Sequence, residues 1–218
     1  MVALGPFAEE DASARKSLFE SSIQFLDENL FSDTTLLFSD TLIPGKDNKK
    51  IINAGFIINA DPPRQLSKLG KFTSPQQIQR TLQNILYSSS SDLPQMSDFG
   101  RLVQLVQKQF SSSPSLGSNK GAPSKILLII TGSNNRDDVA KLDEAISNSL
   151  LKVEGVKILL ITIGGGDDES GALKRGDYAG IVDNDQSLFI VDDKDSKNAL
   201  IGIKDDVTNQ LLTPPGNL

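Results

Sequence analysis

Two stretches of the chain are almost continuously apolar over the length of a strand, and each stops abruptly in small or polar residues. Residues 126–131 read ILLIIT before Gly-Ser-Asn, and residues 156–163 read VKILLITI before Gly-Gly-Gly. Long runs of aliphatic, β-branched residues are typical of strands that are buried on both faces of a parallel sheet. The pattern therefore predicts two parallel strands in a sheet that helices cover on both sides.

The segment between these strands has the pattern of an amphipathic helix. Asn135 is its predicted N-cap, and Asp137 and Asp138 are favourable in the first turn, where the helix dipole attracts negative charge. Gly155 is the predicted C-terminal stop. The apolar stripe is predicted at Val139, Leu142, Ile146 and Leu150. Strand, helix and strand together have the spacing of a βαβ unit.

The rest of the chain continues this alternation. Leu188–Val191 is a predicted short strand, followed by a helix that Asp195 or Ser196 caps and that Thr213-Pro-Pro-Gly ends. The apolar positions of that helix are Leu200, Ile203, Val207 and Leu211. Upstream, the predicted elements are helices at 13–30, 75–87 and 97–110, the second opened by a capping box at Ser74-Pro-Gln-Gln77, and strands at 34–42 and 51–59. We therefore predict an α/β, doubly wound fold with a mostly parallel central sheet flanked by helices on both faces.

The composition is that of a soluble globular domain with an acidic balance. Hydrophobic residues make up 38% and charged residues 23% of the 218 residues, which excludes a disordered chain. The formal net charge of −6 and the lack of a basic stripe argue against nucleic acid and anionic membranes as partners. No apolar run approaches the roughly 18 residues of a membrane helix, so no membrane insertion is expected. The first residues show no signal-peptide pattern.

The chain contains neither cysteine nor histidine. Thiol nucleophiles, disulfides and histidine-based triads are therefore excluded. Catalysis would need paired carboxylates or a Ser–Lys arrangement, and no motif signals either, so we expect no enzymatic activity. The oxygen groups that remain, from Asp, Glu, Ser and Thr, are ligands that suit hard cations such as Mg²⁺.

The order of these elements and several local phrases resemble the von Willebrand factor type A (vWA) domain family. Such domains often read Pro-Lys, an apolar strand ending in Thr-Asp-Gly, a helix, and an apolar strand ending in Ile-Gly-x-Gly. This chain has Ala-Pro-Ser-Lys125, then Thr131-Gly-Ser133, and later Ile163-Gly-Gly-Gly166. The resemblance covers residues 51–212 well and residues 1–50 poorly. It implies one vWA-like domain over residues 1–212 and a C-terminal tail over 213–218.

The resemblance also implies a divalent-cation site at one edge of the sheet, here with a degenerate set of ligands. In the family the ligands are Asp-x-Ser-x-Ser after the first strand, a Thr in a later loop, and the Asp of Thr-Asp-Gly. Gly132 occupies the position of that last Asp, and Ser97 falls near the position of the Thr. Asp11 and Ser13 are the nearest match to the first motif, without a clean third ligand.

Helix starts explain the same polar residues without a metal. Asp and Ser favour N-caps, so Asp11, Ser13 and Ser97 are predicted first of all to begin helices. The strand before them would be Met1–Ala8, which its Gly5-Pro6 makes a poor central strand. Because affinity for hard cations follows the number of charged ligands, we predict no cofactor and at most weak binding of Mg²⁺ or Mn²⁺.

Three other motifs have simpler explanations than a ligand site. Gly164–Gly166 is followed by Asp167, whose charge opposes a phosphate, so a tight turn is predicted there. Asp183–Ser187 resembles the start of a calcium loop, but the turn glycine and the bidentate Glu are missing, so a solvated turn is predicted. Arg175-Gly-Asp177 is the tripeptide that some integrins recognise, and that use requires an exposed and flexible presentation.

Taken with the resemblance, these features predict a macromolecule-binding module with an adhesion, matrix or assembly role. Its partner would be a protein, such as a matrix or cell-surface protein, and its place extracellular. The predicted contact loops contain Asp11, Ser13, Ser97, Ser133, Asn134, Asn135, Gly166 and Asp167. Two alternatives remain open: an intracellular scaffold subunit, and a Rossmann-like enzyme or nucleotide binder with its site near Gly164–Gly166.

Overall fold

The computed structural model describes residues 1–7, 11–32, 54–69, 71–72, 74–88, 97–112, 125–132, 135–164, 173–191 and 195–213. Within these ranges the centre is a six-stranded sheet in the order β3-β2-β1-β4-β5-β6. Every neighbouring pair is parallel except β2 with β3. The strands are β1 (Val2–Leu4), β2 (Phe56–Ile58), β3 (Arg64–Ser67), β4 (Ile126–Thr131), β5 (Lys157–Ile163) and β6 (Leu188–Val191).

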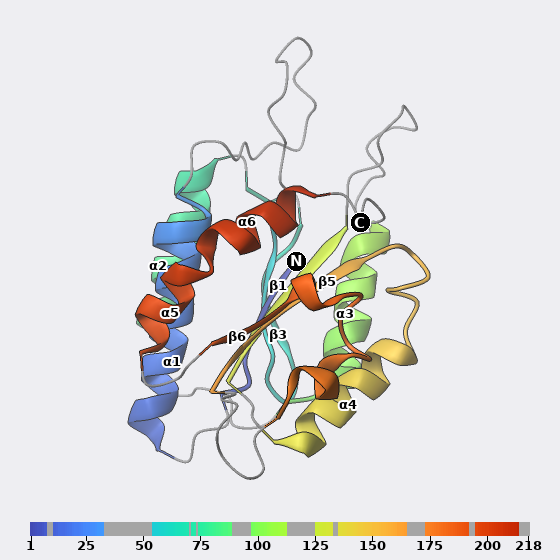
Figure 1. The fold of residues 1–218 in the computed structure, drawn as a ribbon. Helices are drawn as coiled ribbons and strands as arrows, with labels where there is room; N and C mark the ends of the chain where they lie inside the picture. Colours follow the sequence, from blue (N-terminus) through green and yellow to red (C-terminus); the bar gives the residue numbers. More distant parts are fainter. Residues whose placement is uncertain are drawn as a thin grey trace.

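Helices cover both faces of this sheet (Figure 1). The helices are α1 (Ala12–Gln24), which continues as the π-helix η1 (Phe25–Leu30), α2 (Pro75–Ser88), α3 (Phe99–Ser112), α4 (Arg136–Ser147), α5 (Ser196–Gly202) and α6 (Lys204–Leu212). One core cluster joins α1, η1, α2, α5 and α6 to one face, and a second joins α3 and α4 to the other. The predicted doubly wound α/β architecture is therefore confirmed.

The predicted βαβ unit is confirmed, although α4 ends at Ser147 and not at the predicted stop, Gly155. β4 and β5 pair in parallel from Ile126 and Lys157 to Thr131 and Thr162. Asn135 caps α4, because its Oδ1 accepts a hydrogen bond from the Asp138 amide at 2.7 Å. The prediction was wrong at Leu150, which is 58% exposed. Since α4 already ends at Ser147, the turn after it buries Leu151 in its place.

The prediction that Met1–Ala8 is a poor central strand was wrong. β1 lies in the middle of the sheet and pairs in parallel with β2 on one side and β4 on the other. The strand is only three residues long and ends before the glycine and proline that argued against it. Gly5 then turns the chain with a φ of +87°, a region that glycine adopts without strain.

Four further elements differ from the sequence prediction. The helix predicted at 13–30 changes to a π-helix at Phe25, and the C-terminal helix breaks at Ile203 into α5 and α6. The strand predicted at 51–59 is observed only as β2, and residues 51–53 and the strand predicted at 34–42 lie outside the described residues. The antiparallel edge strand β3 was not predicted, because its sequence Arg-Gln-Leu-Ser has one apolar residue.

Candidate functional site

The carboxyl ends of the parallel strands lie together at one edge of the sheet, the lower edge in Figure 1. In open α/β sheets this edge is where ligands bind. Two kinds of described segment lie at this edge. One kind is the residues that follow strands β1, β2 and β4, and the other is the first residues of helices α1, α3 and α4. They contain four of the eight contact residues that the sequence predicted, namely Asp11, Ser13, Ser97 and Asn135.

The ends of β1 and β4 are joined tightly at this edge. The Gly132 amide donates a hydrogen bond to the carbonyl of Pro6 at 2.9 Å, and the Thr131 hydroxyl donates to the same carbonyl at 2.9 Å. The Gly5 amide donates to the Ile130 carbonyl at 2.8 Å. These bonds fix Pro6 and Phe7 directly over the end of β4.

The position where the resemblance expects a metal-ligand Asp lies against two apolar side chains, Phe7 and Leu18. A Cβ atom added at Gly132 would lie 3.0 Å from Phe7 Cδ1 and 3.1 Å from Leu18 Cδ1, closer than ordinary packing. The Phe7 side chain is 0% exposed and packs edge-to-face on Phe19, with ring centroids 5.9 Å apart. A carboxylate at residue 132 would therefore point into an apolar contact.

Asp11 and Ser13 have the structural role that the helix-start prediction gave them. The Asp11 carboxylate accepts hydrogen bonds from the Ser13 amide at 3.1 Å and the Ala14 amide at 3.3 Å, which caps α1. Both residues are exposed. Neither residue directly follows β1. The residues that do are Gly5, Pro6 and Phe7.

At the start of α3 the cap lies one residue later than predicted. Asp98 accepts a hydrogen bond from the Arg101 amide at 2.9 Å, and its other oxygen lies 3.2 Å from Arg101 Nε. Ser97, the residue that the sequence assigned to both the cap and the metal site, is half-buried beside it. An Asp three residues before an Arg was the sequence signal that could have identified Asp98.

Asn135 is exposed at the start of α4, and its amide also donates to the Asp138 carboxylate at 3.0 Å. Four other predicted contact residues lie outside the described residues, namely Ser133, Asn134, Gly166 and Asp167. The described part of the predicted contact surface is therefore formed by Asp11, Ser13, Ser97 and Asn135.

Asn59 is a residue of this edge that the sequence analysis did not single out. Its side chain is fully buried at the end of β2, where the amide nitrogen donates to the Gly5 carbonyl at 3.2 Å. The backbone amide of Asn59 donates a hydrogen bond to the Leu4 carbonyl at 2.8 Å. The Oδ1 atom of the Asn59 side chain makes no hydrogen bond. Asn59 holds the ends of β1 and β2 together, and a polar residue that closes an apolar strand was its only sequence signal.

These residues do not fit a hard-cation site. Mg²⁺ and Mn²⁺ need several oxygen ligands around one point. In the described ranges no three Asp or Glu side chains gather closely enough to hold a metal ion. The Asp11 and Asp98 carboxylates are engaged by helix amides, and apolar side chains lie against Gly132. The arrangement is suited to hydrogen bonding from exposed polar side chains.

The Arg175-Gly-Asp177 tripeptide is exposed but is not a flexible loop. It forms the 3₁₀ turn η2 (Arg175–Tyr178), and the Asp177 carboxylate accepts a hydrogen bond from the Lys174 amide at 2.7 Å. The Arg175 guanidinium donates to the carbonyls of Asp185 at 3.1 Å and Leu188 at 3.3 Å. Both charged side chains therefore bind the protein's own backbone.

Asp27 is the described carboxyl whose surroundings most clearly disfavour its charge. Burial raises its pKa, a hydrogen bond from Gln83 opposes this effect, and the neighbouring charge of Glu28 adds to it. The Oδ1 atom is buried without a hydrogen bond, whereas Oδ2 accepts from Gln83 Nε2 at 3.3 Å. Gln79 of α2 donates to the backbone carbonyl of Asp27 at 3.5 Å, so α2 contacts both the backbone and the carboxyl group of this residue.

We expect the substitution Asp27→Asn to stabilise the protein at neutral pH and to flatten its pH dependence. A raised pKa in the folded state means that the folded protein holds the proton more tightly, so stability is lost as the pH rises through that pKa. The gain should be modest, about 0.5 kcal/mol, because solvent screens this half-exposed group. Urea unfolding at several pH values measures it, and equal stability of both proteins at every pH would contradict it.

Comparison with protein-family models and with curated proteins finds no match for the chain. Solved structures match over nearly its whole length at low sequence identity. Proximal thread matrix protein 1 from the mussel byssus, in a structure with a zinc-occupied MIDAS motif, has a TM-score of 0.59 and 17% identity over 95% of this chain. The chain spans 47% of that protein's length.

Two further structures are similar. The manganese-loaded TRAP protein of Plasmodium vivax has a TM-score of 0.56 and 14% identity, covering 92% of this chain and 72% of its own. The vWF domain of the type V pili tip protein Mfa5 from Porphyromonas gingivalis has a TM-score of 0.56 and 10% identity, covering 96% and 94%. The chain therefore has the fold of a von Willebrand factor type A domain, as its sequence resemblance implied.

Proposed function

We propose that this chain is a protein-binding module that engages its partner at the carboxyl ends of its parallel strands without a divalent cation. The observation that carries the proposal is the packing at Gly132, where the Cβ of a metal-ligand residue would lie 3.0 Å from Phe7 and 3.1 Å from Leu18. A hydrocarbon contact excludes both water and ions. Partner binding at this edge must then rest on the exposed polar groups around it.

Those groups form a surface suited to hydrogen bonding. Asp11, Ser13 and Asn135 are exposed, and Ser97 is half-buried between α3 and the end of β2. Each lies at or next to the start of a helix, so its backbone is held in place. Small polar side chains on a fixed frame give adaptable hydrogen bonds at low entropic cost.

The similar structures support an adhesive or matrix role. They include a matrix protein of the mussel byssus and the tip protein of a bacterial pilus. On this basis we propose that the chain acts outside the cell, binds a matrix or cell-surface protein and catalyses no reaction. No helix in the described part of the chain is long and apolar enough to cross a membrane.

A photo-crosslinking experiment tests the proposed surface. A benzophenone amino acid is introduced at Ser13 or at Ser97, and the labelled proteins are irradiated in an extract of the tissue or culture that produces the chain. We expect both positions to capture the same protein, with equal yield in EDTA and in Mg²⁺. Capture that requires Mg²⁺ would contradict cation independence.

The matched control is the same label at Val153, which is 83% exposed in the turn before β5, at the opposite edge of the sheet. This position should not capture the partner. Equal capture from Val153 and from the two edge positions would show that contact is not confined to the carboxyl ends of the strands.

A further inference from the structure

The outer strand β3 forms one lateral edge of the sheet. It pairs with β2 on its inner side, and in the described ranges no strand pairs with its outer side. An edge strand presents unpaired backbone amides and carbonyls, which can pair with an extended segment of another chain. This lateral edge is distinct from the surface that Asp11, Ser13, Ser97 and Asn135 form at the carboxyl ends of the strands.

A groove of about 550 Å³ runs beside this strand and its continuation. It is lined by Gln65, Leu66, Ser67, Lys68, Leu69 and Lys71. The backbone of this segment is held close to the chain before β2, because a Cβ atom at Gly55 would lie 3.0 Å from the Leu69 amide nitrogen. The glycine thus permits a backbone approach that fixes the groove at the amino-terminal edge of the parallel strands.

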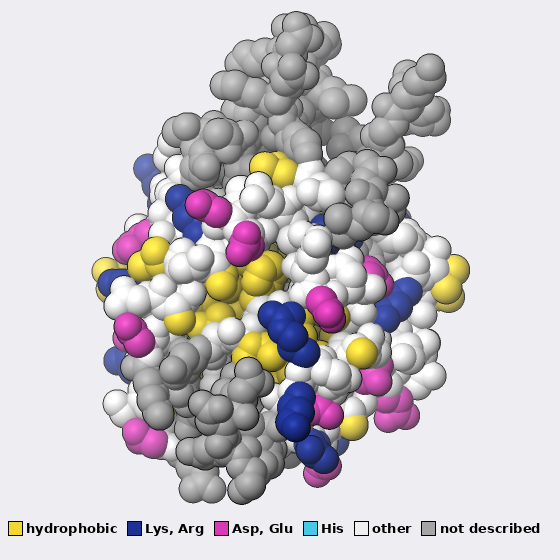
Figure 2. Space-filling view, viewed as in Figure 1, with side chains coloured by type: hydrophobic (Ala, Val, Ile, Leu, Met, Phe, Trp, Pro, Cys, Tyr) yellow, Lys and Arg dark blue, Asp and Glu magenta, His cyan; other side chains and the backbone are white. Residues whose placement is uncertain are grey.

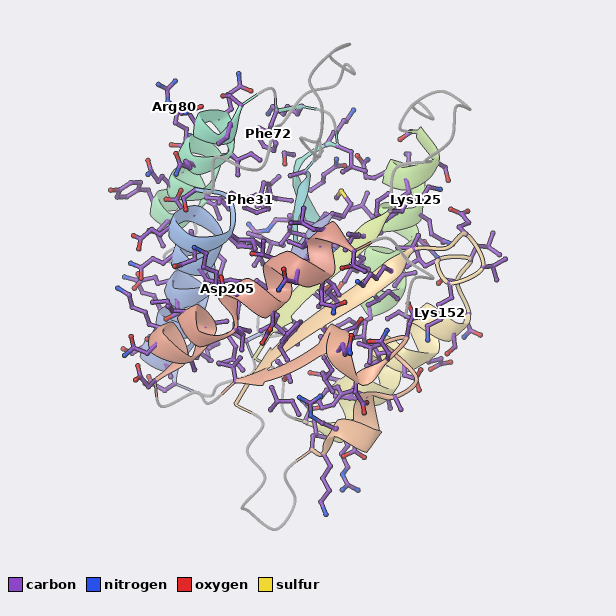
Figure 3. All side chains as sticks on the ribbon, turned by 45° about the horizontal axis from the view of Figure 1, so that its top comes forward. Phe31, Phe72, Arg80, Lys125, Lys152 and Asp205 are labelled. Carbon is purple, nitrogen blue, oxygen red and sulfur yellow. The ribbon has the colours of Figure 1, made fainter. Side chains whose placement is uncertain are left out.

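Within the described ranges the lysines of the groove have no partner, unlike three lysines near the amino-terminal ends of the parallel strands. Lys125 lies 3.3 Å from the Glu154 carboxylate, and Lys157 donates to Gln210 at 2.6 Å. Lys152, labelled with Lys125 in Figure 3, donates to the Gly180 carbonyl at 2.6 Å. Lys68 and Lys71 are exposed and make no hydrogen bond or ion pair with any described residue.

The stretch of sequence that contains the groove residues is basic in a chain whose overall charge is −6. Residues 62–91 contain Arg64, Lys68, Lys71 and Arg80 and no acidic residue. In Figure 3, Arg80 points outward from α2 at the same end of the molecule as Phe72. On the described part of the face in Figure 2, by contrast, basic and acidic side chains are interspersed.

Among the described residues, the side-chain nitrogens of the groove that lack a partner are donors. Gln65 Oε1 accepts a hydrogen bond from Gln109 Nε2 at 3.4 Å, whereas Gln65 Nε2 makes none. The Gln65 Nε2 atom is buried, so the donors that the groove offers to a partner are the exposed ammonium groups of Lys68 and Lys71. Lysines on an edge also repel apolar and basic strands, so the fitting partner is an extended segment rich in Asp and Glu.

We propose that β3 and this groove bind an extended acidic segment of a partner protein, which adds to the sheet as a further strand. Backbone hydrogen bonds to β3 would hold the segment, and its carboxylates would pair with Lys68 and Lys71. The proposal does not rest on the function assigned to the opposite edge, since the two surfaces share no residue.

Fluorescence anisotropy of the full chain with a labelled peptide tests this proposal. The probe alternates Glu and Thr over the length of a strand, so that its carboxylates lie on one face. We expect saturable binding that weakens roughly tenfold in the double variant Lys68→Glu/Lys71→Glu. The matched variant Lys197→Glu/Lys204→Glu, which reverses two charges on α5 and α6, should bind as the wild type does.

Two further probes separate strand addition from charge attraction. A peptide with Lys in place of Glu should not bind, and a peptide with the same carboxylates but N-methylated backbone amides should bind much more weakly. Equal affinity for the methylated peptide would overturn strand addition. Sedimentation that shows a dimer of the chain, lost in Lys68→Glu/Lys71→Glu, would assign the edge to a second copy and also overturn the proposal.

Discussion

The substitution Gly132→Asp is expected to destabilise the protein by roughly 3–5 kcal/mol at neutral pH. The new carboxylate would enter the contact with Phe7 and Leu18, where a Cβ alone already approaches to 3.0 Å. Burial would raise its pKa in the folded state, so the loss should shrink as the pH falls and the group becomes neutral. Urea unfolding at neutral and mildly acidic pH measures both effects.

Two control variants separate crowding from charge. Gly132→Ala adds only the Cβ and should cost about 1–3 kcal/mol through overpacking. Gly176→Asp adds the same carboxylate at an exposed glycine with no atom within 4 Å of its Cβ, and should change stability little. If Gly132→Asp proved as stable as Gly176→Asp, or if Mn²⁺ restored its stability, the space at the end of β4 would be a cation site after all.

Truncation of the ring that fills this position is expected to cost nearly as much. Phe7→Ala should lose about 3–5 kcal/mol, because a fully buried phenylalanine leaves a cavity when it is shortened. The ring also contributes its edge-to-face contact with Phe19. Thermal or urea unfolding measures the loss.

The matched control for this variant is Tyr87→Ala, which shortens an aromatic ring that is 82% exposed at the end of α2. It should change the free energy of unfolding by less than about 0.5 kcal/mol. Equal losses from the two substitutions would mean that Phe7 does not pack into the core as the structure describes.

The parts of the fold that follow from local pattern were predictable. β4 and β5 have long apolar runs and α4 begins at a capping Asn135, and these features lie where the sequence indicated. The end of α4 does not, because the helix stops at Ser147, before the predicted stop at Gly155. Helix starts at Asp11 and Ser74 were likewise found from capping chemistry, since one side chain accepting a backbone amide determines each of them. The order of elements then identified the fold.

The parts that depend on tertiary contacts were not predictable. β1 is central because β2 and β4 pair with it, although three residues are too few to show a period. β3 is polar because its outer side is an edge, so the hydrophobic pattern is absent. The break at Ile203 leaves Leu200 and Val207 on the buried side, so the stripe was correct although the helix was not continuous.

The candidate site combines both cases. The absence of an Asp at Gly132 was evident from the sequence, and it predicted a weakened cation site. The sequence could not show that Phe7 turns back over β4, because this requires the Gly5 turn and the hydrogen bond from Gly132 to Pro6. In the described residues, the structure places Phe7 and Leu18 against Gly132, and the helix starts at Asp11, Asp98 and Asn135 lie at the same edge of the sheet.

The measurement that tests cation independence most directly is a Mn²⁺ titration of the wild-type protein followed by thermal unfolding. Any ligand that binds only the folded state raises its stability, by about 2.7 kcal/mol at a hundredfold excess over Kd. With Phe7 and Leu18 at the position of the missing carboxylate, the unfolding midpoint should stay unchanged from EDTA to millimolar Mn²⁺. A saturable rise in the midpoint that EDTA reverses would contradict the account.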